Sequence, residues 1–267
     1  YPMAKNLSLI LLLSVVILAC RPESETDAFW DGINTKNKYQ PFTFALTSSQ
    51  IETCASISQP TLTSMLNAEF EGIDNAKINA SMMFSSIEDP QYSNIAEELK
   101  FLFDLNGNNT FTNYPAFVNN LTCFNTDTAS FFESIRTQIN SSPKIKLGIK
   151  TVIDNNDLNI YVKGEYQDNV TNNHSIAIYI YRKSEWANQV TPSGTESTRF
   201  KNKIISATTP TVGFTLAKNN KGETFRKTGT FTFSSENLSN LGVLAIVYNL
   251  ENNKPFEVLN SLKSENF

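Results

Sequence analysis

The sequence predicts a mixed α/β region followed by an all-β region, with the boundary near residues 140–144. Up to residue 142, segments that alternate apolar and polar residues are interleaved with segments whose apolar residues recur at helical spacing. From Pro143 onward the period is two, and turn residues separate the segments. The first pattern is typical of helices layered on a sheet, and the second is typical of a β-sandwich.

Residues 1–19 are predicted to be a targeting signal. Lys5 supplies a positive charge, and residues 7–18 form an unbroken run of apolar residues and serine that ends at Ala19-Cys20. This run is shorter than the about 20 residues that a membrane-spanning helix needs, and it fits the apolar core of a secretory signal peptide. An ordinary cleavage site and an uncleaved signal anchor are the alternatives.

The small residue before Cys20 resembles the end of the bacterial lipobox, which implies that Cys20 is lipidated and becomes the first residue of the mature chain. Residues 20–39 are then the lipidated N-terminus and a flexible tether, because Pro22 and the acidic residues after it cannot bury a core. The acidic stretch also resembles the surface-export signal of Bacteroidota lipoproteins. Simple solvation of a linker explains it equally well.

Residues 40–142 are expected to form the α/β region. Asp89 followed by Pro90 is typical of a helix start, because Asp caps free backbone N–H groups and Pro fits the first turn. Asp127 is expected to cap the last helix in the same way. The expected strands lie at residues 42–46, 76–84, 113–119 and 122–124, and the expected helices lie at residues 60–70, from 89 and from 127.

Residues 143–267 are expected to form the β-sandwich. About seven segments have strand character and no helix interrupts them, and Asp154–Asp157 is read as a turn between the first two. The segments lie at residues 145–149, 158–162, 175–181, 212–216, 229–233, 241–248 and 257–259.

The first region resembles thioredoxin in the order of its motifs. The stretch that ends at Cys54 aligns without a gap with the pattern Phe-Thr-Gly-Thr-Trp-Cys-x-x-Cys, which puts Ile51 at the nucleophilic cysteine and Cys54 at the resolving one. Tyr114 and Pro115 resemble the start of the strand that carries the cis-proline of that fold. The resemblance implies a degenerate thioredoxin-like domain over residues 40–142.

The second region resembles the end of the outer-membrane-protein-28-related lipoproteins of Bacteroidota. Residues 239–249 and 256–260 are similar to that family's Leu-x-Val-Val-Ala-Phe-Val-Tyr-Asp and Glu-Val-Leu-Asn, and Asn202 stands where the family often has His-Asn-His. That family joins a thioredoxin-like domain to a β-rich C-terminal domain. The resemblance covers about residues 40–262 and implies a divergent member, located at the outer membrane and facing the periplasm or the cell surface.

The residues at the thioredoxin-like site do not support catalysis, so we expect the protein not to be an enzyme. Thiol–disulfide exchange needs an attacking thiolate, and Ile51 has none. The remaining thiols of this region, Cys54 and Cys123, form either a structural disulfide or two buried free thiols.

Composition excludes other functions. One histidine, His174, and three cysteines offer too few ligands for a Cys/His metal site, so we expect no metal and no other cofactor. A net charge of −4 and the lack of a basic run disfavour nucleic-acid binding.

Three functions remain open. The first, which we expect, is a non-catalytic binding or accessory subunit for envelope proteins, held to the membrane by lipid on Cys20. Its contact surface is expected either in the cleft between residues 48–52 and Tyr114-Pro115, or on the outer face of the C-terminal sheet. The second function is a ligand-binding surface lipoprotein for peptide or glycan, and the third is a thiol–disulfide oxidoreductase with a degenerate site.

Strand aromatics separate the second function from the first. Tyr179, Tyr181 and Trp186 favour ligand binding if they gather on one exposed face, and their alternative is ordinary strand composition.

Overall fold

The structure is a computed structural model, and its N-terminal unit ends at Asn34 while a compact unit runs from Thr35 to Phe267. Within the described residues, no helix is long and apolar enough to cross a membrane. The residues that the structure describes are 26–36, 38, 40, 42–47, 79–84, 87–103, 116–117, 123–124, 133, 135–137, 139–191, 194–217, 219–233 and 237–264.

The N-terminal unit contains the short helix α2 (Asp27–Asp31). It starts after Thr26, whose Oγ1 accepts a hydrogen bond from the backbone N–H of Phe29 at 3.2 Å. Asp27 adds negative charge to the first turn, where the helix dipole favours it. Part of the predicted flexible tether, residues 27–31, is therefore helical.

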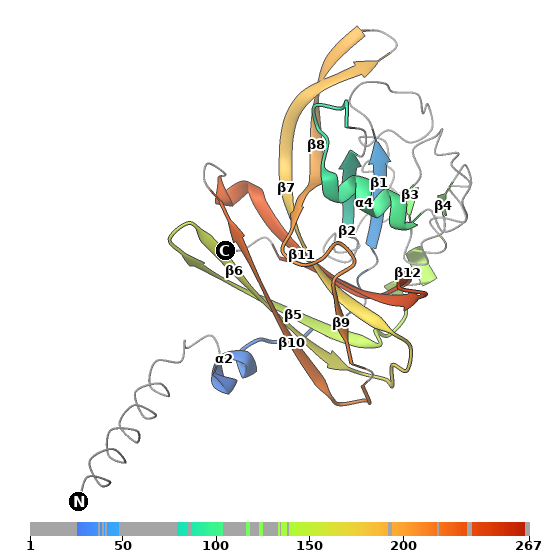
Figure 1. The fold of residues 1–267 in the computed structure, drawn as a ribbon, viewed down its shortest axis with the longest axis vertical. Coiled ribbons are helices and arrows are strands. Elements are labelled where there is room, and N and C mark those ends of the chain that lie inside the picture. The colour runs from blue at the N-terminus through green and yellow to red at the C-terminus, as the bar shows by residue number, and fades with distance from the viewer. Residues whose placement is uncertain are drawn as a thin grey trace, which may run out of the picture. The chain divides into compact units, whose positions relative to one another are not determined.

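One sheet of nine described strands runs through the compact unit. The strands lie in the order β12-β11-β7-β8-β2-β1-β3-β4, and β9 pairs with β7 off this path (Figure 1). Their bounds are β1 (Phe42–Thr47), β2 (Asn79–Phe84), β3 (Ala116–Phe117), β4 (Cys123–Phe124), β7 (His174–Thr191), β8 (Gly194–Ala207), β9 (Phe214–Leu216), β11 (Leu241–Glu251) and β12 (Lys254–Ser264).

The first region contributes β1 to β4 to this sheet. β1 and β2 are parallel, β3 is antiparallel to β1, and β4 is antiparallel to β3. β2 also pairs in parallel with β8, at Met82 opposite Lys203. Strands from both predicted domains therefore share one sheet, and the predicted domain boundary between residues 142 and 143 stays a prediction.

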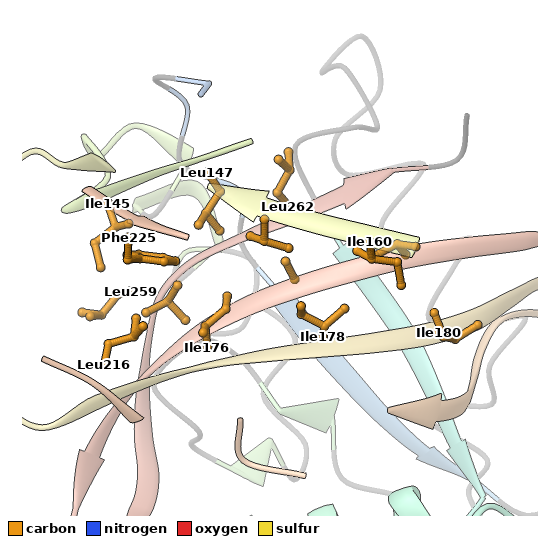
Figure 2. Packing of buried hydrophobic residues seen from close by; sticks show 14 of the residues in the cluster. Ile145, Leu147, Ile160, Ile176, Ile178, Ile180, Leu216, Phe225, Leu259 and Leu262 are labelled. Carbon is orange, nitrogen blue, oxygen red and sulfur yellow. The ribbon is translucent and has the colours of Figure 1, made fainter. Parts of the chain in front are cut away.

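A second sheet of three described strands, β10-β6-β5, packs on one face of the large sheet. It consists of β5 (Ile145–Asp154), β6 (Asp157–Tyr166) and β10 (Thr224–Thr232), all antiparallel. The predicted turn at Asp154–Asp157 is confirmed, and Asn155 adopts a φ of 53°, which asparagine tolerates better than most residues. Figure 2 shows the apolar cluster that both sheets share, which includes Ile145, Ile160, Phe225, Ile178, Leu259 and Leu262.

The central strands β7 and β11 are buried on both faces. On β7, the even-numbered residues 176–180 belong to the cluster shared with the small sheet. The odd-numbered residues 177–181 belong to a second cluster, which includes Phe42 of β1 and Leu99 of helix α4 (Asn94–Phe103). Strands buried on both faces have continuous apolar runs, which explains why the sequence of this part of β7 hardly alternates.

Several predicted elements are found, and two details are wrong. The predicted strands of the first region agree with β1 to β4, and helical residues with a fully buried Ile135 lie where the last helix was expected. Helix α4 begins at Asn94 and not at Asp89, because the Asp89 carboxylate accepts a hydrogen bond from the Gln91 N–H at 2.8 Å and stabilises a turn. The expected helix at residues 60–70 lies outside the described residues.

The second error is the omission of β8 from the expected strands. Its first half, residues 194–201, is polar or charged at every position except Gly194 and Phe200, so no apolar alternation reveals it.

Candidate functional site

β7 and β8 continue beyond the sheet as a two-stranded ribbon of residues 183–191 and 194–201, here named the arm. The pairing of β7 with β11 ends at Arg182. Its pairing with β8 continues from Ser184 opposite Lys201 to Thr191 opposite Gly194, and Figure 1 shows the two strands running on together. Among the described strands, none other pairs with the arm.

Asn240 fixes the base of the arm. Its Oδ1 accepts a hydrogen bond from the backbone N–H of Ser184 at 3.0 Å, and its Nδ2 donates to the Ser184 carbonyl at 2.7 Å. The side-chain amide of Asn240 thus makes the two backbone hydrogen bonds that a further residue of β11 would have made to Ser184. Lys183 Nζ adds a hydrogen bond to the carbonyl of Ser239 at 3.0 Å.

A charged cluster stands beside this base. Glu185 Oε2 lies 2.7 Å from a guanidinium nitrogen of Arg182 and 3.2 Å from Nζ of Lys203, which also donates to Gln91. Burial lowers the pKa of Lys203, and the Glu185 charge opposes this effect. Burial acts to raise the pKa of Glu185, but the hydrogen bonds and charges of Arg182 and Lys203 lower it overall. These contacts tie the arm to the turn before α4.

Beyond Ser184, one edge of β7 pairs with β8, and the opposite edge, here called the outer edge, faces away from it. Because the N–H and C=O of Ser184 point to Asn240, those of Trp186 and Asn188 point to the same edge, since alternate residues of a strand share it. Residues 186–191 contain no charge and no proline, the usual protection of an edge strand. The edge is therefore a template to which a further strand can be added.

Trp186 is a large apolar residue of the arm that faces solvent, with 67% of its surface exposed. It lies opposite Arg199, whose Nε donates to Oγ of Ser184 at 2.6 Å. Tryptophan and arginine are among the residues most enriched at binding hot spots, so this pair is a candidate contact surface.

The other two strand aromatics do not join Trp186. Tyr179 and Tyr181 are fully buried, and the Tyr179 hydroxyl donates to the Thr211 carbonyl at 2.5 Å. Burial raises the pKa of Tyr179 well above its usual value. The exposed aromatic face that would have favoured a peptide or glycan site is therefore not formed by these three residues.

His174 is a buried structural residue. Its Nδ1 lies 3.0 Å from the carbonyl of Asn172 and therefore donates, which leaves Nε2 to accept from the Tyr166 hydroxyl at 2.6 Å. Burial lowers the pKa of His174 and raises that of Tyr166 to about 12, so both side chains are neutral. Within the described residues, no three His, Cys, Asp or Glu side chains gather as metal ligands.

The residues singled out by the thioredoxin and lipobox motifs are not among those described. Cys20, Ile51, Cys54, Tyr114 and Pro115 lie outside the described residues. The backbone of Cys123 is in β4, opposite Phe117, but its side chain is not described. The lipidation, the degenerate redox site and the Cys54–Cys123 disulfide stay predictions.

Comparison with solved structures identifies the fold. HBP35 of Porphyromonas gingivalis matches 87% of this chain and 76% of its own, with a TM-score of 0.67 and 13% sequence identity. The chain has the fold of HBP35. No family model and no curated protein matches the sequence.

Two further solved structures are similar over a part of the chain. A domain of the outer membrane lipoprotein Omp28 from Porphyromonas gingivalis matches 46% of this chain and 88% of its own, with 15% identity and a TM-score of 0.31. CsgH of R. palustris matches 45% and 93%, with 9% identity and a TM-score of 0.18. The fold assignment depends on HBP35, because these two TM-scores are low.

Proposed function

We propose that the protein is a non-catalytic lipoprotein of the outer membrane that holds an envelope protein through the β7–β8 arm. The observation that carries this proposal is a ribbon that leaves the core with an uncharged outer edge and an exposed Trp186. Lipid on Cys20 is the proposed membrane anchor.

The arm suits a partner that binds in extended form. A two-stranded ribbon is marginally stable in water, so the arm depends on the contacts at its base, and its solvent-facing Trp186 adds nothing to the core. An added strand would hydrogen-bond to the backbone groups of Trp186 and Asn188, and a pocket on the partner would receive the indole ring. Asn240 and the Arg182–Glu185–Lys203 cluster supply a fixed orientation, which reduces the entropic cost of binding.

We further propose that the chain is a divergent relative of the outer-membrane-protein-28-related lipoproteins, with a degenerate thioredoxin-like domain in residues 40–142. The support is the element order of that region, with a parallel β1–β2 pair, α4 after β2, and antiparallel β3 and β4. Ile51 at the position of the attacking thiol supports the absence of redox activity.

Two experiments test the anchor and the absence of redox chemistry. The Cys20→Ala variant should leave the membrane pellet after a carbonate wash, because a diacyl or triacyl anchor holds what a single chain binds only weakly. Retention of this variant in the pellet rules out the lipid anchor. The purified protein should not reduce insulin disulfides, and measurable turnover contradicts the non-catalytic proposal.

Affinity purification from the protein's own membranes tests the arm. Trp186→Ser should lose an envelope protein that the unchanged chain retains. Phe101→Ser is the matched control, because Phe101 is also exposed, at 74%, but lies on α4. Equal retention by the unchanged chain, by Trp186→Ser and by Phe101→Ser contradicts a role of the arm.

A further inference from the structure

The face of the arm that carries Trp186 also carries Arg199, an arginine with no carboxylate partner among the described residues. Cross-strand neighbours share a face, and β7 and β8 place Trp186 opposite Arg199 and Asn188 opposite Ser197. Arg199 is partly buried, and its Nε donates a hydrogen bond to Oγ of Ser184 at 2.6 Å. That hydroxyl is neutral, so within the part of the chain that the structure describes the charge of Arg199 is in no ion pair.

The carboxylates of the arm are placed elsewhere. At the base, Arg182 lies 2.7 Å from an oxygen of Glu185, which also pairs with Lys203. Glu185 and Glu196 are the acidic residues of the arm, and their registers put both on the face opposite to Trp186. Partial burial removes water from around a cation, so a carboxylate that arrives with a partner gains more there than at a fully exposed side chain.

The guanidinium of Arg199 crosses from β8 onto β7. Arg199 is directly opposite Trp186, whereas Ser184 is two residues nearer the base of the arm. The hydrogen bond to Ser184 therefore draws the guanidinium over β7 and toward the outer edge. Neighbouring strands are about 4.8 Å apart, so the charge lies roughly one strand spacing closer to that edge than the β8 backbone does.

A strand added at the outer edge would bring its own side chains beside this charge. Its residue opposite Trp186 lies on the same face and is diagonal to Ser184, where the guanidinium is held. Diagonal neighbours are about 7–8 Å apart, a span that long side chains bridge. Since Ser184 engages Nε, the two Nη groups of Arg199 are the donors that remain for a carboxylate.

We infer that the segment that binds the arm is acidic and extended, with a carboxylate that pairs with Arg199 beside the residues that cover the Trp186 indole. The inference rests on the proposed function for the addition of a strand at the outer edge, and it adds the chemistry of the partner. The edge supplies backbone hydrogen bonds, Trp186 supplies apolar area, and Arg199 selects the charge of the segment.

A phage-displayed library of random dodecapeptides tests the inference on the full chain, purified in detergent and immobilised. Parallel selections use the unchanged chain, Trp186→Ser, Arg199→Gln and Arg199→Glu. Arg136→Gln is the matched control, because it removes the same charge from a residue outside the arm. Clones that bind the unchanged chain but not Trp186→Ser are the ligands of the arm.

These clones should share an acidic residue. The Arg199→Gln selection should lose this preference, Arg199→Glu should replace it with a preference for lysine or arginine, and Arg136→Gln should keep it. In one selected peptide, replacing the acidic residue by its amide should weaken binding to the unchanged chain and to Arg136→Gln roughly tenfold. The same replacement should leave binding to Arg199→Gln unchanged, because the interaction is already absent there.

Arm ligands without a shared acidic residue, or an acidic preference that persists in Arg199→Gln, overturn the inference while the arm remains a strand acceptor. A different result contradicts the proposed function itself: no selected clones, or clones that bind Trp186→Ser as well as they bind the unchanged chain. The inference then fails with it, and the two failures are distinguished by whether binding depends on Trp186.

Discussion

The two halves of β7 differ in how their edges are paired and in how far their side chains are buried. From His174 to Arg182, the strand is paired at both edges and its side chains enter two apolar clusters. From Lys183 to Thr191, it is paired with β8 alone, and its tryptophan faces solvent. The chain continues without a turn from one half to the other, so the halves differ in their side chains and in what surrounds them and not in secondary structure.

The first half of β7 contributes to stability, whereas the second half is the proposed site of contact with a partner. The first half is held by burial, which stabilises in proportion to the apolar area removed from water. The second half is held at its base by Asn240 and by the charged cluster, and it gains little from its own side chains. A segment that adds little to stability while presenting an edge and an indole ring is suited to binding a partner.

The largest effect is expected in the buried half. Ile178→Ala should lower the free energy of unfolding by about 2–5 kcal/mol, because Ile178 is fully buried between the two sheets and its truncation leaves a cavity. Chemical denaturation followed by circular dichroism measures this loss. A loss below about 0.5 kcal/mol contradicts the close packing of this half.

Acid should destabilise the buried end of β7 through His174. Its folded-state pKa is lowered by burial, so the unfolded chain binds the proton more readily. The contribution to stability is complete above the unfolded pKa of about 6.5 and is lost as pH falls toward the folded pKa, by at most about 1.4 kcal/mol per pH unit.

His174→Gln is the variant that isolates this titration. It should flatten the dependence of unfolding free energy on pH below about 6.5, whatever its effect at neutral pH. An unchanged slope in this variant assigns the acid sensitivity to other groups.

A smaller effect is expected where the two halves meet. Asn240→Ala removes both hydrogen bonds to Ser184 and should cost about 1 kcal/mol in unfolding free energy. Amide hydrogen exchange should become faster in residues 183–191 and remain unchanged in residues 176–181. Equal acceleration in both halves contradicts the role of Asn240 as the fixation of the arm.

The smallest effect on stability is expected at Trp186. Trp186→Ser should change the free energy of unfolding by about 0.5 kcal/mol or less, because 67% of the residue is exposed. Comparing the denaturant midpoints of Trp186→Ser and Ile178→Ala tests this difference within one strand. A cost near that of Ile178→Ala shows instead that the indole ring belongs to the core.

The sequence predicts the core better than the arm because the core strands carry a strong apolar signal. The runs at residues 175–181 and 241–248 are strands because both of their faces are apolar. β8 was not predicted because its first half is polar. That half is held by pairing with β7 and not by burial of its side chains. Its buried Phe200 and Ile204 are too few to show a period.

Of the three strand aromatics that the sequence offered as a ligand-binding face, Trp186 is exposed, and Tyr179 and Tyr181 are buried. Trp186 is a useful marker by its type, but sequence alone does not tell that Tyr179 and Tyr181, seven and five residues before it, are buried. The open edge follows from where β11 ends, which is a property of tertiary pairing. Asn202 at the base of the arm adopts a φ of 54°, which asparagine tolerates better than most residues. The residue type is therefore consistent with an irregular backbone there, but it predicts no partner.

Site-specific photo-crosslinking of the lipidated full chain in its own membranes tests the central claim most directly. A benzophenone amino acid is placed at position 188, on the outer edge of the arm, and at position 101, on the exposed face of α4. The account predicts a discrete protein adduct from position 188, lost when Trp186→Ser is added, and no such adduct from position 101. No adduct from position 188, or the same adduct from both positions, contradicts the arm as the contact surface.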